Sequence, residues 1–483
     1  MQTSEIIVFV LYLFFMLSVG VFFFIKDRNG GEKTYFLGDR KMGAWVSALS
    51  TGASDMSAWL LMGFPTTIYL LGFGEVWIPV GLALGLSCCW IFEAPRLRRF
   101  SIVSGDAITI PQYLSNRFLA KSKALQVICA IVFLIAYTIY TAASIKGCGI
   151  LFGKVIGMSP NYAMYLAVFI IVGYTFLGGF SAVCWTDFFQ GLLILGALLL
   201  APLFASFMLE PSSQTISDPN YWNAFSNWRK IISGLAWGLG YFGMPHIIIR
   251  FMSIKSQNEL KKSAVIGISW TVLVLLFATI IGIIGRMKLG LNEEIAQNEL
   301  VFVQMVRMIF PGIISGILLS AVLAASMSTA DSQLLSASSA FASDVYKPII
   351  RKNQASEKEL MWAGRIVVLA LAGCALVLAS SPNADSIMGL VEKAWGVFGA
   401  AFGPTILLSL FWRRFSFAGA IAGIVTGAAV DIAWIFFMSQ TGIYELAPGF
   451  LAGLTAAVVV SLLTKPNEEV EKLFDEAVNV EPF

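Results

Sequence analysis

The sequence has little charge, a single histidine and no paired cysteines, and these absences exclude several classes of protein. Only 13% of the 483 residues are charged, the net charge is +3, and His246 is the one histidine. The basic residues form short clusters without a continuous stripe, so nucleic-acid binding is not expected. The six cysteines lie in apolar stretches without CxxC spacing, which argues against a zinc site or a disulfide framework. With no metal-ligand cluster and no nucleophile and base pattern, we expect that the chain is not an enzyme.

Apolar surface is what the chain has in abundance. Hydrophobic residues make up 58% of the sequence, more than a water-soluble core can bury. Each membrane crossing needs about 20 mostly apolar residues, so the chain holds material for about a dozen crossings. The first apolar run, 6–25, follows Glu5 and lacks a basic start and a small-residue cleavage site. We therefore interpret it as a transmembrane helix rather than a signal peptide.

Apolar windows predict an all-α integral membrane protein with about thirteen transmembrane helices. The predicted spans lie near 5–25, 42–70, 73–95, 124–150, 160–179, 182–208, 230–251, 263–285, 301–342, 361–381, 387–411, 416–438 and 445–464. The span 301–342 is longer than one crossing needs and contains Pro311 and Gly312. We expect a short re-entrant or interfacial start there, followed by the true helix.

The basic residues give an orientation, because cytoplasmic loops concentrate Lys and Arg. Most of the 32 basic residues fall after spans one, three, seven, nine and eleven and in the tail. This alternation predicts an amino terminus outside and a carboxyl terminus inside. We expect a multi-pass protein of the cell membrane, and specifically of the bacterial inner membrane, surrounded by membrane lipid.

Two spans contain helix-breaking residues at mid-membrane. The second carries Gly52-Ala53-Ser54-Asp55-Met56-Ser57-Ala58-Trp59, and the seventh carries glycines and a proline between Gly234 and Pro245. Transporters with inverted repeats place their substrate where one helix of each repeat is broken. The two breaks stand five spans apart, and an odd offset reverses the direction in which the second unit crosses the membrane. We therefore predict that spans two to six and seven to eleven form a LeuT-type five-plus-five inverted repeat.

This interpretation divides the chain into six parts. They are a first helix with its cytoplasmic loop (1–41), the first five-helix repeat (42–208), an extracellular loop (209–228), the inverted second repeat (229–411), two peripheral helices (412–464) and a short cytoplasmic tail (465–483).

The first break is suited to an alkali ion. Carbonyl groups freed by an unwound turn lack partners, and a bare sodium ion can replace the lost hydrogen bonds. The carbonyls of Ala53 and Met56, facing the hydroxyls of Ser328 and Thr329 in span nine, predict an oxygen cage for sodium. The freed amides at the half-helix start suit a substrate carboxylate, so one break can couple ion and substrate.

Several long motifs resemble the sodium/solute symporter family, and within it the members that carry proline. They are LSTGASDMSAWLLMGFP (Leu49 to Pro65), GGFSAVCWTDFFQ (Gly178 to Gln190), WGLGYFGMPHIIIRFM (Trp237 to Met252), LSAVLAASMSTADSQLLSASSA (Leu319 to Ala340) and AWGVFGAAFGP (Ala394 to Pro404). The resemblance covers roughly residues 5 to 465, and motifs of this length in order are far more specific than any one glycine pattern.

The resemblance implies sodium-coupled uptake of L-proline by alternating access, with sodium as the co-transported ion and no obligate protein partner. By resemblance, the sodium site comprises Ala53, Met56, Ala325, Ser328 and Thr329, and the proline pocket comprises Ser57, Trp59, Tyr140, Trp237, Tyr241 and Pro245. Aromatic walls suit a compact apolar ring with a cationic secondary amine. Another small solute of the same family, such as a sugar, a vitamin or a different amino acid, is the alternative substrate.

Four further charged residues are functional candidates, and each has a simpler interpretation. Asp55 is an acid deep in an apolar segment, where such residues are costly unless they function or cap a helix. Asp187 can be solvated or paired, although in some relatives an acid here contributes to a second sodium site. Asp331 shares a helix face with Ser328. Arg40 can serve orientation alone, although an arginine at this place matters for transport in the family.

Three other functions fit the sequence less well. A channel needs a continuous lined pore, whereas broken helices favour an occluded site. A sensor needs an output domain, and the tail after Lys465 is too short for one. A membrane enzyme lacks the catalytic groups named above.

Overall fold

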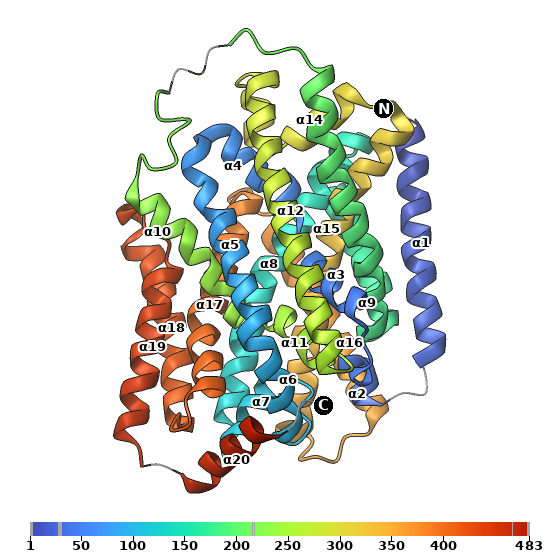
Figure 1. Cartoon of the computed structure of the whole chain (residues 1–483). Helices are drawn as coiled ribbons and strands as arrows, with labels where there is room; N and C mark the ends of the chain where they lie inside the picture. The colour runs from blue at the N-terminus through green and yellow to red at the C-terminus, as the bar shows by residue number, and fades with distance from the viewer. Residues whose placement is uncertain (1–2, 28–30, 215, 217, 466, 481–483) are drawn as a thin grey trace.

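The computed structural model is a bundle of helices that describes residues 3–27, 31–214, 216, 218–465 and 467–480. Within these residues the only strand pairing is an isolated bridge between Met42 and Ile254. The two ends of the chain lie at opposite ends of the bundle (Figure 1). The predicted all-α class is therefore confirmed.

The helices of the first half follow one another with short connections. They are α1 (Thr3–Asp27), α2 (Glu32–Leu37), η1 (Gly38–Arg40), α3 (Ala44–Asp55), η2 (Trp59–Gly63), α4 (Phe64–Leu71), η3 (Gly72–Val76), α5 (Trp77–Cys88), η4 (Cys89–Glu93), α6 (Ala94–Val103), α7 (Ile110–Arg117), α8 (Ala124–Ile156) and α9 (Pro160–Met208).

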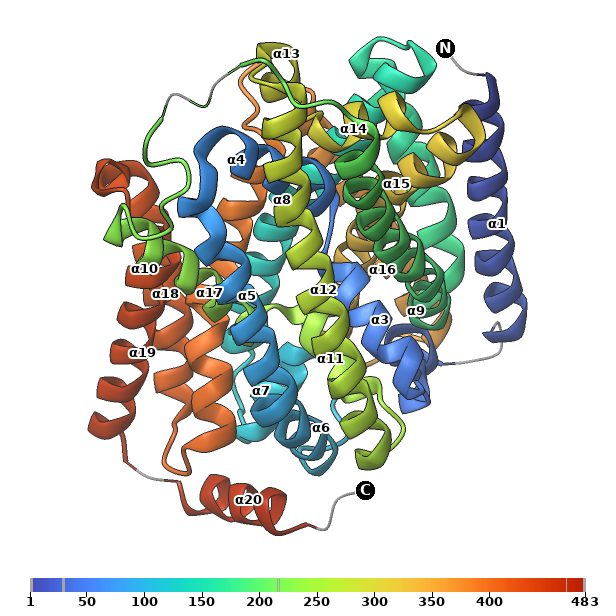
Figure 2. The same cartoon turned by 45° about the horizontal axis from the view of Figure 1, so that its top comes forward.

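The second half continues in the same manner. Its helices are α10 (Trp228–Ala236), η5 (Trp237–Gly243), α11 (Pro245–Ser253), α12 (Gln257–Leu289), α13 (Glu293–Gln297), α14 (Val301–Ile309), α15 (Gly312–Ser339), η6 (Ala340–Ile350), α16 (Glu357–Ala379), α17 (Ile387–Phe411), α18 (Phe417–Phe437), η7 (Ser439–Thr441), α19 (Leu446–Leu463) and α20 (Glu468–Asn479). The short α20 lies across the end of the bundle away from the N-terminus (Figure 2).

Ten of the described helices are long and apolar enough to cross a membrane, or eleven if the bent pair α10 and α11 is one span. The predicted number of thirteen is larger for two reasons. Much of the predicted spans 42–70 and 73–95 falls in one run, Trp59–Val103, and the span predicted at 160–179 contains a shorter apolar helix, Pro160–Gly173. The number thirteen therefore stays a prediction.

Both predicted breaks are confirmed. Helix α3 ends at Asp55, Met56 leaves helical geometry with φ −86° and ψ 77°, and helical turns resume near Trp59. In the second break, α10 passes into the tight turns of η5, and Met244 is extended before Pro245 starts α11. The chain bends by 48° there.

Two other interruptions behave as their residues require. Pro311 separates α14 from α15, as the length of that predicted span suggests. The spans predicted at 160–179 and 182–208 form the single element α9, bent at Gly179 where φ is +61°. A side chain at Gly179 would be strained by this φ and would also meet the Tyr35 ring at 2.9 Å.

A glycine contact holds the second break against α5. A Cβ atom at Gly85 would lie 2.2 Å from the carbonyl oxygen of Gly238, and one at Gly81 would lie 2.3 Å from that of Gly234. Backbone therefore packs directly on backbone, as small residues allow in membrane helices. Helix α15 lies inside the bundle, with 83% of its most apolar window buried, so its polar face meets the first break within the protein.

Candidate functional site

The end of α3 faces the middle of α15. The hydroxyl of Ser328 donates to the carbonyl oxygen of Ala53 at 2.7 Å and to that of Ala325 at 3.1 Å. The hydroxyl of Thr329 is buried and has no hydrogen-bond partner among the described residues. Met56 lies in the break itself, and the side chains of Ala53, Met56, Ala325, Ser328 and Thr329 are all buried. Of the residues predicted for sodium, the structure thus joins Ala53, Ala325 and Ser328 by hydrogen bonds, and the sodium site itself stays a prediction.

Asp55 links the first break to the second. Its side chain is only 1% exposed, and one carboxylate oxygen, Oδ2, accepts a hydrogen bond from the hydroxyl of Tyr241 in η5. The other, Oδ1, has no partner among the described residues. The backbone carbonyl of Asp55 accepts from the indole of Trp59 at 3.3 Å and from the hydroxyl of Tyr140 in α8 at 3.2 Å. Three predicted pocket residues therefore converge on this acid.

The remaining pocket residues line the same region. The ring of Trp237 lies 6.4 Å from that of Trp59. Ser57 sits in the break, where its hydroxyl accepts from the amide of Trp59 at 3.5 Å, and Pro245 is buried at the start of α11. Aromatic side chains of both breaks thus gather around Asp55.

Trp395 of α17 belongs to this wall although it was not predicted as a site residue. Its indole donates to the carbonyl oxygen of Trp237 at 2.8 Å, and its ring packs edge-on against Tyr241 at 5.0 Å. A Cβ atom at Gly240 would lie only 1.9 Å from the indole nitrogen. The signal in the sequence was the glycine-rich stretch of η5, since a side chain at Gly240 would block the approach of this indole.

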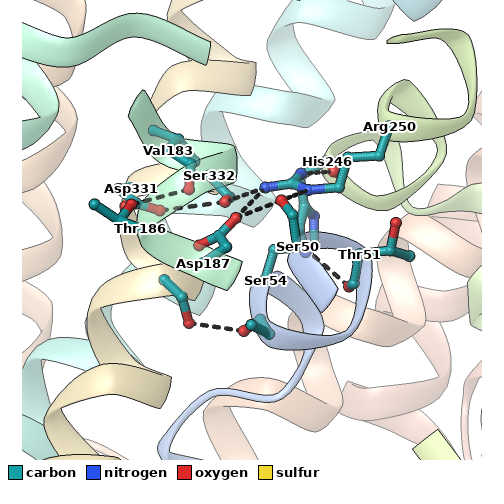
Figure 3. Close-up of polar contacts among 12 residues, drawn as sticks. Ser50, Thr51, Ser54, Val183, Thr186, Asp187, His246, Arg250, Asp331 and Ser332 are labelled. Carbon is teal, nitrogen blue, oxygen red and sulfur yellow. Dashed lines mark hydrogen bonds and ion pairs between the residues drawn. The ribbon is translucent and has the colours of Figure 1, made fainter. Parts of the chain in front are cut away.

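Asp187 is held by an arginine that sequence reasoning missed (Figure 3). The guanidinium of Arg250, in α11, forms an ion pair with Asp187 of α9 at 2.8 Å, and the two side chains are 2% and 0% exposed. The same guanidinium donates to Ser50 of α3 at 2.7 Å and to Ser332 of α15 at 2.6 Å. Ser50 in turn donates to Asp187 at 2.6 Å.

This cluster, which we name the Arg250 cluster (Ser50, Asp187, Arg250 and Ser332), joins four helices one turn away from the breaks. Asp331 lies beside it and accepts from the hydroxyl of Ser332 at 3.2 Å. Burying a charge is tolerated only when it is paired and hydrogen-bonded, and here the arginine supplies the opposite charge. The sequence signal was an arginine in the apolar end of span seven, which alone does not reveal its partner 63 residues earlier.

Arg40 is not part of either group. It is the last residue of η1, which precedes α3. Its guanidinium pairs with Asp106 at 2.9 Å and donates to the carbonyl oxygens of Met252 and Ala107 at 2.6 and 2.7 Å. Arg40 therefore connects the loop before α3 with the end of α11 and the loop after α6. Its contacts are those of a residue that fixes helix ends.

A cavity of about 530 Å³ borders the second break from the opposite side. Trp237 lines it, and Tyr444 stacks on Trp237 with ring centroids 5.0 Å apart. Trp237 thus contacts this cavity on one side and Trp59 of the first break on the other. In the part of the chain that the structure describes, no group of three or more His, Cys, Asp or Glu side chains is placed to hold a metal ion.

Comparisons with known proteins agree on one family. The model of the sodium:solute symporter family matches residues 35–427. The chain is 42% identical over 470 residues to the high-affinity proline transporter PutP of Bacillus subtilis (strain 168), which covers 95% of this chain and 98% of that protein. It is 41% identical over 489 residues to the sodium/proline symporter of Escherichia coli (strain K12), covering 99% and 96%.

A solved structure gives the same result for the fold. The model matches a sodium-coupled sialic acid symporter, solved in a substrate-bound outward-open state, with a TM-score of 0.79. The match covers 96% of this chain and 99% of that one at 20% sequence identity. At this level of identity the likeness concerns the fold alone.

Proposed function

This chain belongs to the sodium:solute symporter family, and from its site we propose that it is a sodium-coupled symporter that imports L-proline by alternating access. The observation that carries the proposal is the first break, where the carbonyl oxygen of Ala53 in α3 meets the hydroxyl of Ser328 in α15, next to the Thr329 hydroxyl, which has no hydrogen-bond partner among the described residues. The proline transporters at about two-fifths identity over nearly the full length support the substrate. The reaction moves its substrate without changing it, as in the relatives named above, which are transporters.

The sodium ion binds between α3 and α15. Its ligands are the carbonyl oxygens of Ala53, Met56 and Ala325 and the hydroxyl oxygens of Ser328 and Thr329. Neutral and anionic oxygens are what a hard cation prefers. When the ion arrives, the hydroxyl of Ser328 turns its proton away from Ala53, because a hydroxyl offers lone pairs as well as a donor. The hydroxyl of Thr329, which has no partner among the residues that the structure describes, gains one.

L-proline binds on the other side of Asp55, within reach of Ser57, Trp59, Tyr140, Trp237, Tyr241 and Pro245. Its carboxylate meets the start of the helical turns at Trp59, since the first amides of a helix attract anions. Its ring and secondary ammonium pack against the aromatic faces. Asp55 stands between ion and substrate, so each raises the population of the state that binds the other.

The Arg250 cluster has a supporting role in this proposal. Arg250 acts as a built-in cation for Asp187, and it ties α3, α9, α11 and α15 into one unit on the inner side of the breaks. Asp331 contributes through Ser332. Arg40 holds the end of α11 next to the loop before α3, so movement of either broken helix is transmitted to the other.

The finer topology is part of the proposal. We place thirteen spans in the membrane with the amino terminus outside, arranged as the five-plus-five inverted repeat and the six parts given above. Two observations support it: the chain ends lie at opposite ends of the bundle, and the two breaks pack against each other through Asp55 and Tyr241. An inverted repeat brings two such breaks to one level of the membrane.

Uptake of radiolabelled L-proline into proteoliposomes tests the function. We expect accumulation with an inward sodium gradient, none when choline replaces sodium, and none in Asp55→Asn. Asp344→Asn is the matched control, because Asp344 is also a buried acid but bonds to Thr109 at 2.6 Å, away from the breaks. Sodium binding without proline uptake would reject proline, and competition by sugars, vitamins or other amino acids would then identify the solute.

A further inference from the structure

Asp431 is a buried acid that the proposed transport cycle does not use. It lies in α18, its side chain is 0% exposed, and neither carboxylate oxygen has a hydrogen-bond partner among the described residues. The side chain occupies a gap left by glycines on two neighbouring helices. A Cβ atom at Gly396 of α17 would lie 2.8 Å from Asp431 Oδ1, and one at Gly449 of α19 would lie 3.0 Å from Asp431 Cβ.

A second acid reaches the same gap. The Cβ position of Gly396 is 3.3 Å from Cγ of Glu445, the residue that precedes α19. The side chains of Asp431 and Glu445 therefore meet over one glycine. Unlike Asp431, Glu445 is only partly buried, and it lines the 530 Å³ cavity beside Trp237.

The cavity gives this pair of acids access from one end of the bundle. Glu392 and Ile435 line it. Glu392 is one turn from Gly396 on α17, and Ile435 is one turn from Asp431 on α18. Asp431 therefore lies one helical turn deeper than the cavity wall. A small cation that enters the cavity reaches Glu445 first and Asp431 next.

The cavity's own cations are already engaged. Lys230 pairs with Glu75 at 2.7 Å, and Lys393 pairs with Asp385. The other charged or titratable groups that face the pair are Glu392 and the hydroxyl of Tyr444, which donates to the carbonyl oxygen of Glu392 at 2.8 Å. The acids of this region thus outnumber the lysines.

A carboxylate that is buried without a donor or a counter-ion is strongly disfavoured, so something must neutralise Asp431. We propose that Asp431 and Glu445 form a second site for a monovalent cation, a proton or a sodium ion taken from the cavity, separate from the sodium site between α3 and α15. Glu445 captures the cation at the cavity, and Asp431 holds it between α17, α18 and α19.

The position of this site couples it to the second break. Glu445 follows Tyr444, which stacks on Trp237, and Asp431 lies against α17, which carries Trp395. Binding of the cation removes the repulsion between two acids and draws α18 and α19 against α17. The site thereby favours the arrangement in which Trp237 is held by Tyr444 and Trp395.

Two measurements on the purified full-length protein test the site independently of which solute is carried. The first is the number of ²²Na⁺ ions bound at saturation, and the second is the dependence of sodium affinity on pH between about pH 5.5 and pH 8.5. We compare the wild type with Asp431→Asn, which keeps the shape, and with Glu445→Gln, which lies at the less buried half of the pair.

A sodium ion at this site predicts that both variants bind one ion fewer than the wild type. If the site instead binds a proton, the wild type and both variants should bind the same number of sodium ions. The sodium affinity should then change at least about threefold across this pH range in the wild type and should not depend on pH in either variant. A wild type that binds one sodium ion with affinity independent of pH overturns the proposal without recourse to any variant. The proposal is also overturned if the wild type binds two sodium ions or has a pH-dependent sodium affinity and both folded variants behave in the same way.

Discussion

Replacing Thr329 by valine separates the energy of sodium binding from the energy of folding. Valine has nearly the shape of threonine but lacks the hydroxyl, and that hydroxyl is buried with no hydrogen-bond partner in the part of the chain that the structure describes. Thr329→Ser is the matched variant, because serine keeps the hydroxyl and loses only a methyl group. The two substitutions therefore divide one side chain into its polar and apolar parts.

Thr329→Val should weaken sodium binding but should not destabilise the ion-free protein. An oxygen that contacts a charge contributes about 1.5–3 kcal/mol, so Thr329→Val should raise the sodium concentration for half-maximal uptake about 10- to 150-fold. Without sodium, the same change removes an unsatisfied buried hydroxyl, whose burial costs about 1–3 kcal/mol, so the ion-free protein should be at least as stable as the wild type. Thr329→Ser should shift sodium affinity by less than about threefold.

The assay pairs uptake at varied sodium with thermal unfolding in detergent, with and without sodium. In the wild type, sodium raises the unfolding temperature because it binds the folded state alone. In Thr329→Val this rise should be lost at the sodium concentration that saturates the wild type. Unchanged sodium affinity together with reduced stability in the absence of sodium would refute the reasoning, since Thr329 would then be a packing residue.

Three further expectations concern the surroundings of the site. Tyr241→Phe removes the donor to Asp55, so proline uptake should weaken about tenfold or more while the protein stays folded, measured as the Michaelis constants for proline and sodium. Arg250→Lys keeps the charge that pairs with Asp187 but cannot reproduce the planar fork that also reaches Ser50 and Ser332, so the uptake rate should fall strongly, and uptake equal to the wild type would make the charge alone sufficient. For Asp106, partial burial by itself raises the pKa, but bonds from Lys33 and Arg40 outweigh it and hold the pKa below its ordinary value of 3.8. Its ionic contact is therefore fully present above pH 3.8 and is lost as the pH falls through the lower, folded-state pKa. Because Asp106 is 47% exposed, Asp106→Asn should lower the unfolding temperature only slightly at neutral pH and not at all in strong acid.

The sequence predicted the breaks because their signals are local. Glycine, serine and aspartate grouped before Trp59, and several glycines followed by Pro245, weaken an apolar helix where they cluster. The oxygen-rich face of α15 was visible for the same reason, since Ser328 and Thr329 stand next to each other. Nothing in these patterns depends on distant parts of the chain.

The contacts that were missed all depend on distant parts of the chain. Arg250 looked like a residue of the positive-inside pattern, and only the folded structure brings it to Asp187. Trp395 and Asp431 are explained by glycines on neighbouring helices, and a sequence does not state which helices are neighbours.

The ion pair of Arg250 and Asp187 has a consequence for the driving force. The pair carries no net charge, and L-proline is a zwitterion, so the charge that crosses the membrane in each cycle at the α3 and α15 site is that of sodium. Moving one elementary charge through the membrane potential is worth about 2.3 kcal/mol per 100 mV, which corresponds to about fiftyfold accumulation. Movement of one sodium ion with zwitterionic L-proline is therefore electrogenic, the neutral pair adds no charge to it, and membrane voltage drives uptake even where sodium is equal on both sides.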